Sequence, residues 1–200
     1  PLCWPSVLSS AISPGTMNEY QVFYEATPNP QSLKFTVTAQ IANESMNFTN
    51  VQETARSPLA RKIFGFPWAA GVFIGPTFVT VTKQDWVDWD ILSDPLSDLI
   101  REHLQRAEGV LLPDTSAPED SGENDSPIVR QIKQILRDEI RPAVAMDGGD
   151  IVFEKYDEGR VYLHMQGSCS GCPSSAYTLK EGIETRLRAA IPEIQEVVSV

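Results

Sequence analysis

Two cysteines, Cys169 and Cys172, stand two residues apart in the stretch GSCSGCPSS (167–175). Thiolates bind zinc and iron–sulfur clusters, and a C-x-x-C pair is also typical of dithiol redox sites. The pair therefore has four interpretations: buried structural thiols, a dithiol–disulfide oxidoreductase, a structural zinc site, or an iron–sulfur site. The glycine and serine neighbours are unlike a protein core, which argues against the first.

The thiol pair falls between a strand-like run and a helical one. Pro173 suits the first position of a helix, which would place Cys172 at the N-cap and Cys169 in the loop before it. There the helix macrodipole stabilises a thiolate, and the free N–H groups of the first turn can donate to sulfur. Gly167 and Gly171 keep the loop free of side chains, so the backbone can approach a bulky ligand. This position favours ligand binding.

The number of ligands separates the remaining interpretations. A thioredoxin-type pair opens a βαβ unit, whereas these thiols follow a hairpin. Zinc and iron–sulfur sites normally need four ligands, and His164, the other soft candidate nearby, alternates away from the apolar strand face. Because one chain supplies two thiols, a four-thiolate site requires a second copy of the motif from another protomer across a two-fold axis. Such an exposed, divisible site suits handing a cluster over.

Residues 127–200 predict a compact domain of α-β-β-α-β order. Ser126 and Pro127 are a typical N-cap and first helical residue, with Pro142 perturbing the helix end. Gly148-Gly149 marks a turn; the flanking Asp147 and Asp150 fit turn and capping roles better than chemistry. The remaining expected elements are strands at 151–156 and 161–166, a helix from Pro173 to Pro192, and a third strand within 194–200.

The rest of the chain predicts a second α+β domain and a linker. Residues 113–126 carry five acidic groups, no basic group and no large apolar one, so we expect a flexible acidic linker. Residues 17–112 mix extended runs at 33–37 and 77–82 with a helical run at 96–107. Residues 1–16 are expected to be a disordered or non-native extension, with Met17 as a candidate start or a trimmed precursor as the alternative.

Charge and composition exclude several functions. The net charge is −11, which argues against nucleic acid because phosphate binding needs a basic face. No stretch approaches the roughly 20 apolar residues that cross a bilayer, so no membrane partner is expected. Three cysteines do not form a disulfide framework, which favours a reducing compartment. Trp86 and Trp89 form an acidic, aromatic patch with neighbouring aspartates, interpreted as core and capping residues or as a partner-docking surface (Asp85, Asp88, Asp90).

The sequence resembles the NifU-like (Nfu) iron–sulfur scaffold and carrier proteins over nearly all of 20–200. The C-terminal motifs are RPAVAMDGGDIVF and MQGSCSGCPSSAYTLKEGIETRLRAAIPEI, and the N-terminal ones are TPNPQSLKF, RSPLARKIF and GVFIGPTFVTVTKQDWVDWD. The chain departs from many relatives at Ala145-Met146, where they carry a polar pair. This departure touches neither cysteine.

The resemblance implies a non-enzymatic carrier in which Cys169 and Cys172 ligate a [4Fe-4S] cluster shared between two protomers. It implies a homodimer when cluster-bound, an upstream assembly scaffold as donor, and apo iron–sulfur proteins as recipients. The N-terminal domain would aid stability and recognition. We expect a bacterial cytoplasmic protein, with the mitochondrial or plastid matrix as alternatives. A dithiol oxidoreductase and a zinc-bridged dimer stay open as other functions.

Overall fold

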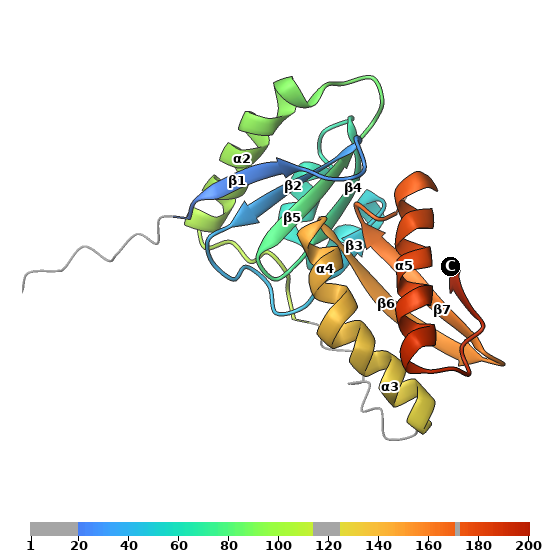
Figure 1. Ribbon diagram of the computed structural model, residues 1–200. Helices are drawn as coiled ribbons and strands as arrows, with labels where there is room; N and C mark the ends of the chain where they lie inside the picture. Colours follow the sequence, from blue (N-terminus) through green and yellow to red (C-terminus); the bar gives the residue numbers. More distant parts are fainter. Residues whose placement is uncertain (1–19, 114–124, 171–172) are drawn as a thin grey trace, which may run out of the picture.

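The computed structural model describes residues 20–113, 125–170 and 173–200 (Figure 1). The described residues form two α+β domains, each with its own sheet and its own buried apolar cluster. The expected extension at 1–16 and most of the expected linker at 113–126 lie outside the described residues, as do Cys3 and Cys172.

The N-terminal domain is built on a five-stranded antiparallel sheet in the order β1-β2-β5-β4-β3. Its strands are β1 (Val22–Ala26), β2 (Ser32–Val37), β3 (Met46–Phe48), β4 (Ala69–Ile74) and β5 (Phe78–Lys83). The expected extended runs at 33–37 and 77–82 are confirmed as β2 and β5, whereas the other three strands were not predicted.

Three helical segments cover one face of this sheet. They are η1 (Val51–Arg56), α1 (Pro58–Ile63) and α2 (Trp89–Gln105). Residues Ile63 and Ile100 from the helices lie in one buried cluster with Phe35 and Val79 from the strands. Helix α2 begins seven residues before the expected helical run and continues through Pro95. The buried side chains on either side of that proline, Leu92 and Leu96, hold the helix against the sheet.

The C-terminal domain has a three-stranded sheet in the order β6-β7-β8. Its elements are α3 (Pro127–Ile135), η2 (Leu136–Ile140), α4 (Arg141–Met146), β6 (Gly149–Asp157), β7 (Arg160–Gly167), α5 (Pro173–Ala190) and β8 (Glu196–Ser199). Strands β6 and β7 are antiparallel, and α5 is the crossover to β8, which pairs with β7 in parallel. The predicted α-β-β-α-β order is confirmed.

The first helix of this domain begins as expected but ends later. Ser126 Oγ accepts a hydrogen bond from Val129 N at 3.3 Å, and Pro127 is the first helical residue. The helical path then continues through a π segment and Pro142 to Met146. A proline inside a helix lacks an N–H and crowds the carbonyl one turn earlier. The wider π turn directly before α4 accommodates this, so Pro142 does not end the helix.

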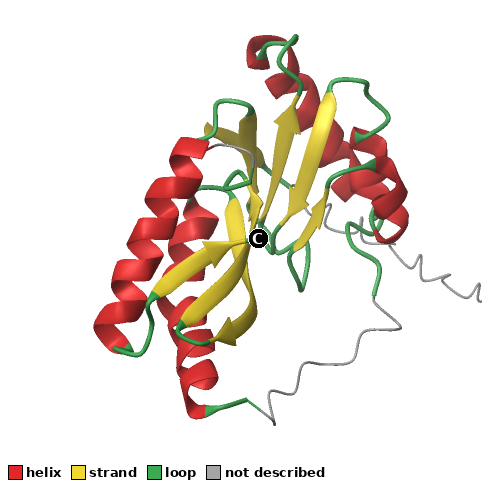
Figure 2. Ribbon diagram, turned by 90° about the vertical axis from the view of Figure 1, so that its right-hand side faces the viewer, coloured by secondary structure: helices red, strands yellow, loops and turns green. Residues whose placement is uncertain are grey.

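The expected hairpin is also confirmed. Strands β6 and β7 are joined by Glu158 and Gly159, both with positive φ (45° and 84°), as a tight two-residue hairpin turn requires. Figure 2 shows the strands of the two sheets lying between two groups of helices, one group for each domain. None of the helices in the described ranges combines the length and apolar character that crossing a membrane requires.

Candidate functional site

The thiol loop (residues 167–172, described as far as Ser170) connects β7 to α5. It starts at Gly167, whose φ of 67° lies in the left-handed region that favours glycine. Ser170 then turns back on Gly167: its N and Oγ both donate to the Gly167 carbonyl oxygen, at 3.1 and 2.8 Å. This turn holds Cys169 inside the loop.

A second turn (residues 147–149) clamps the thiol loop. Ser168 N donates to Gly148 O at 3.2 Å, and Ser168 Oγ donates to the Asp147 carbonyl oxygen. Gly149 leaves room for the sulfur, because a Cβ atom added there would lie 2.6 Å from Cys169 Sγ. The two turns together form a cradle around the thiol. Residues 148 and 149 are both glycine, so neither places a side chain in this cradle.

The two aspartates that flank Gly148-Gly149 have structural roles. Asp147 ends α4 as its C-cap residue. Asp150 is buried and accepts two hydrogen bonds from Arg141, at 2.7 and 2.6 Å, as well as one from Ile151 N at 2.8 Å. These contacts tie α4 to β6 and fix the start of the strand. Asp150 is therefore engaged by the fold, consistent with the turn and capping interpretation.

Cys169 is 6% exposed and belongs to the apolar cluster of its domain. Burial raises the pKa of its thiol above the ordinary range, and the charges of Asp147 and Asp150 act in the same direction, against a lowering by the Ser168 hydroxyl. This is opposite to the thiolate expected from a helix N-terminus. Sequence reasoning missed it because apolar periodicity does not extend into the loop. The free thiol is neutral, and a coordinating metal would displace its proton.

The geometry of the loop bears on all four interpretations of the thiol pair. Cys169 is as buried as a structural thiol, contrary to the expectation from its glycine and serine neighbours. A redox dithiol needs an accessible sulfur of low pKa, which this burial opposes. His164 lies on the solvent side of β7, where it pairs with Glu154 and contacts Val200 O. The described ranges contain no cluster of three or more His, Cys, Asp or Glu side chains arranged to hold a metal.

The N-terminal domain contacts this site through residues to which the sequence analysis gave no role. Lys34 Nζ donates to Met146 O at 2.9 Å, and Thr80 Oγ1 donates to Gly148 O at 2.6 Å. Asn29 Nδ2 lies 3.5 Å from Ser170 O. Two of these residues stand in the motif TPNPQSLKF, but a single sequence does not show which segment a polar side chain meets across a domain interface.

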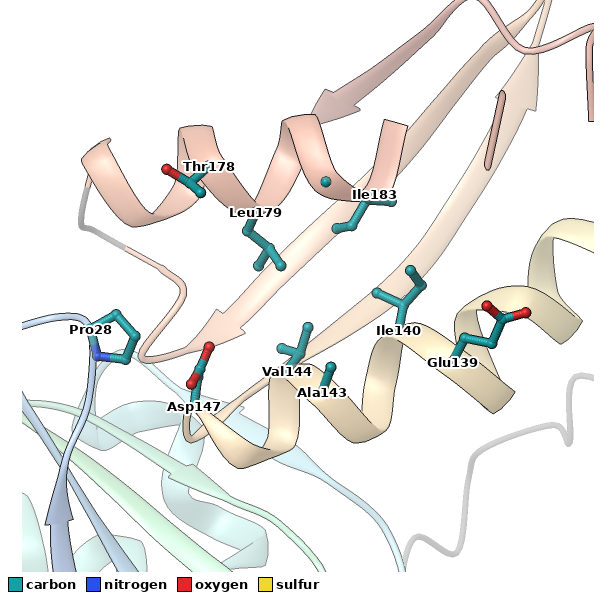
Figure 3. Close-up of a pocket in the computed structure, with 10 residues that line it drawn as sticks. Pro28, Glu139, Ile140, Ala143, Val144, Asp147, Thr178, Leu179 and Ile183 are labelled. Atoms are coloured by element: carbon teal, nitrogen blue, oxygen red, sulfur yellow. The ribbon is translucent and has the colours of Figure 1, made fainter. Parts of the chain in front are cut away.

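A groove of about 550 Å³ opens beside the thiol loop, between the η2–α4 helix and α5 (Figure 3). Leu179 and Ile183 of α5 face Ile140 and Val144 across it, with Asp147 near one end. Its lining contains neither cysteine nor histidine. The groove therefore adds no thiol or imidazole ligand to the two cysteines.

The Trp86/Trp89 patch divides between its two interpretations. Trp89 packs against the N-terminal core, and its Nε1 donates to Pro30 O at 3.1 Å, as a structural residue would. Trp86 is 66% exposed. The core interpretation holds for Trp89 only.

The C-terminal domain carries its C-x-x-C loop between a β-hairpin and a crossover helix, and a second α+β domain precedes it. This arrangement defines the class of NifU-like proteins with an added N-terminal domain. Residues 132–198 match the NifU-like domain, and residues 22–107 match the scaffold protein Nfu/NifU N-terminal domain. The chain belongs to the Nfu family of NifU-like proteins, and the resemblance seen in the sequence is confirmed.

Named relatives agree with this assignment. The chain is 39% identical over 176 residues to the human "NFU1 iron-sulfur cluster scaffold homolog, mitochondrial", covering 87% of this chain and 69% of that protein. It is 41% identical over 179 residues to "NifU-like protein 4, mitochondrial" of Arabidopsis thaliana, covering 86% and 63%. It is 40% identical over 179 residues to the homolog of Drosophila sechellia, covering 87% of this chain and 62% of that protein. The chain thus spans a little under two thirds of the last two proteins.

Proposed function

We propose that this protein is an iron–sulfur cluster carrier that holds a [4Fe-4S] cluster between two protomers through Cys169 and Cys172 of each. The cluster is cargo: it arrives from an upstream assembly scaffold and leaves for apo iron–sulfur proteins. Relatives named as iron–sulfur cluster scaffolds support the general role. The observation that carries the proposal is the side-chain-free cradle in which Cys169 Sγ rests on Gly149.

The proposed chemistry is binding and release. Iron–sulfur clusters normally take four thiolates, and each chain brings two from its thiol loop. Each cysteine loses its proton to solvent when sulfur bonds iron. Because the four ligands come from two chains, separating the protomers opens half of the coordination sphere to the thiols of a recipient. No catalytic residue is needed, and we propose that the protein is not an enzyme.

The domain boundaries complete the proposal: an N-terminal domain at 17–112, a linker at 113–126, and a cluster-binding domain at 127–200. The relatives named as mitochondrial favour an organelle matrix over the bacterial cytoplasm first expected. A dithiol oxidoreductase is disfavoured by the burial of Cys169. A zinc-bridged dimer would use the same four thiolates, so metal identity has to separate it from the cluster carrier.

Anaerobic reconstitution tests the proposal. The purified chain is incubated with iron and sulfide, desalted, and analysed by visible spectroscopy and by iron, sulfide and zinc content. We expect a brown protein with four irons and four sulfides for every two chains. When an apo-recipient is added, the carrier should lose this colour and the recipient should gain it. A colourless protein that retains zinc through the same treatment would refute the carrier function.

A further inference from the structure

Lys34, Thr80 and Phe73 form one row across the outer face of the N-terminal sheet. Thr80 is opposite Lys34 of β2 on one side and opposite Phe73 of β4 on the other. All three are buried, at 8%, 1% and 1% exposure, although none belongs to the apolar cluster under the helices. The open face of an antiparallel sheet is normally solvated, so these residues need a cover. The C-terminal domain provides it.

Side chains of the row bind backbone carbonyl groups of the C-terminal domain. Lys34 Nζ and Thr80 Oγ1 donate to Met146 O and Gly148 O, respectively. A buried ammonium is costly without acceptors, and Lys34 has a second one in Glu25 at 2.8 Å. The face is thus suited to a turn that presents carbonyl oxygens, and on release its lysine and threonine would be hydrated.

The turn that docks on this row has to lack side chains. Gly148 has a φ of 79°, and a Cβ atom there would lie 2.8 Å from Thr80 Oγ1 and 3.2 Å from Lys34 Cβ. A Cβ atom on Gly167 would lie 3.1 Å from Phe73 Cδ1. Positive φ accounts for each glycine within its own domain. For Gly148 the close approach to Thr80 and Lys34 is a second, independent constraint that points to a fitted interface. A Cβ atom on Gly167 would first meet Gly148 O, at 2.6 Å, within its own domain.

This docking contacts the thiol loop on both sides of Cys169. Phe73 lies against Gly167, and Asn29 Nδ2 approaches Ser170 O at 3.5 Å. Figure 1 shows β7 ending, and the thiol loop starting, against the N-terminal domain. A second protomer that shares a cluster has to bring its own thiol loop within bonding distance of the same metal atoms. In the docked chain the N-terminal sheet occupies part of the space that the second thiol loop needs.

We propose that the outer face of the N-terminal sheet is a docking surface for the thiol loop of its own chain, and that it competes with a second protomer for that loop. The competition rests on the proposed cluster-bridged dimer; the docking surface does not. The sheet covers the loop in the cluster-free chain and leaves it when the shared cluster binds. Docking therefore lowers the apparent affinity for the cluster, because only chains in the undocked fraction can bind it.

Alkylation of Cys169 tests the docking surface without any cluster. In a full chain carrying Cys3→Ser and Cys172→Ser, Cys169 is the remaining thiol. Thr80→Arg places a long side chain where Gly148 docks, and Lys34→Met keeps the aliphatic stem but removes the donor. Thr82→Arg is the matched control: Thr82 is half-buried on the same face of β5 and bonds Ser32 within its own domain.

The rate of reaction with iodoacetamide, followed by mass spectrometry, is the readout. Thr80→Arg should raise the rate roughly tenfold or more, because the row holds the 147–149 turn and the thiol loop that together enclose Cys169, and alkylation follows the population in which they open. Lys34→Met should raise it by a smaller factor, and Thr82→Arg should leave it unchanged. Equal rates in the parent, Thr80→Arg and Lys34→Met chains would overturn the docking surface. Protection that appears only at high chain concentration would place the docking between chains and overturn docking within one chain.

Cluster loading tests the competition. In chains with all cysteines present, Thr80→Arg and Lys34→Met should reconstitute at a lower iron and sulfide concentration than wild type, and Thr82→Arg should match wild type. Slower or weaker loading in both interface variants would mean that the sheet positions the loop instead of blocking it, and the competition would fall. If no chain, wild type included, takes up a cluster while the alkylation rates still differ, the carrier function fails and the docking surface stands.

Discussion

The sulfur of Cys169 packs directly on the backbone of Gly149. A Cβ atom added to Gly149 would lie 2.6 Å from Cys169 Sγ and 2.7 Å from the carbonyl oxygen of Gln166. The sulfur could rotate away from such an atom, but the carbonyl oxygen is part of the β6–β7 pairing and cannot. Residue 149 thus couples the position of the thiol to the start of the C-terminal sheet.

Gly149→Ala is expected to destabilise the C-terminal domain by about 1–3 kcal/mol, the usual cost of overpacking a tight site. It should also lower the iron retained after reconstitution, since the thiol is pushed out of its cradle. Denaturant unfolding and iron analysis measure the two effects.

Gly182→Ala is the matched control for that substitution. Gly182 lies within α5, and a Cβ atom there meets nothing within 4 Å. Alanine should stabilise the helix by about 0.5–1 kcal/mol through its higher helix propensity. Equal changes in the free energy of unfolding for the two variants would show that Gly149 is not sterically constrained.

Serine substitutions identify the proposed ligands. Cys169→Ser and Cys172→Ser should each abolish cluster binding, because each removes two of four thiolates from a dimer. Cys3→Ser should bind as wild type does. Iron content and the visible spectrum after reconstitution measure binding, and circular dichroism checks the fold. A full complement of iron in either the Cys169 or the Cys172 variant would remove that residue from the ligand set.

Much of the C-terminal domain could be predicted because its signals are local. Ser126 and Pro127 begin a helix through side-chain capping and a fixed φ, and alternation from Val161 to Met165 separates the two faces of β7. These patterns depend on neighbours along the chain. The hairpin turn at Glu158-Gly159 is local in the same sense.

The burial of Cys169 and the interdomain contacts could not be predicted in this way. Cys169 is buried because a turn twenty residues earlier folds over it, and Thr80 meets Gly148 across 68 positions of sequence. The alternation of β5 places Thr80 on the face opposite Val79 and Val81, yet alternation does not say what covers that face. Long-range contacts between polar groups carry no sequence period.

The ion pair between Arg141 and Asp150 should contribute to the stability of the cluster-binding domain. Asp150→Ala leaves Arg141 and the Ile151 N–H without an acceptor, which should cost about 1–3 kcal/mol. The exposure of Arg141, 44% for its side chain, keeps the cost below that of a fully buried pair. Asp138→Ala, at an exposed position of η2, is the charge-matched control and should change little. Comparable destabilisation by both variants would mean that net charge, not this pair, is responsible.

His103 should make the stability of the N-terminal domain depend on pH. Burial lowers the pKa of His103 below its ordinary value near 6.5, and the charge of Lys62 adds to this, although Gly109 O and Glu108 oppose it. The unfolded chain therefore takes up a proton at a higher pH than the folded chain. The stability from a neutral His103 is complete above pH 6.5 and declines as the pH falls through the lowered pKa.

His103→Asn removes that titration. Thermal unfolding of wild type and variant between pH 7.5 and 5 measures the difference, and wild type should lose stability more steeply. The carboxylates titrate in both chains, so their contribution cancels in the comparison. Parallel pH profiles would show that His103 titrates alike in the folded and unfolded states.

The last prediction couples association to the cluster: the chain should be monomeric without a cluster and dimeric with one. Two thiols per chain and four per cluster set one cluster for two chains. Each chain carries a net charge of −11, so two cluster-free protomers repel each other. Bonds from both chains to one cluster offset this repulsion, and by mass action the dimer should dissociate when a chelator removes the iron.

Light scattering on cluster-free, reconstituted and chelator-treated samples at equal concentration measures this coupling. The reconstituted sample should have twice the mass of the other two, and Cys172→Ser should stay monomeric after the same treatment. High salt is an informative second condition, because it screens the repulsion between exposed charges but supplies no bridging bond. A cluster-free dimer at high salt would show that repulsion alone keeps the chains apart. One cluster per monomer would refute the shared geometry, since two thiols from a single loop would then suffice.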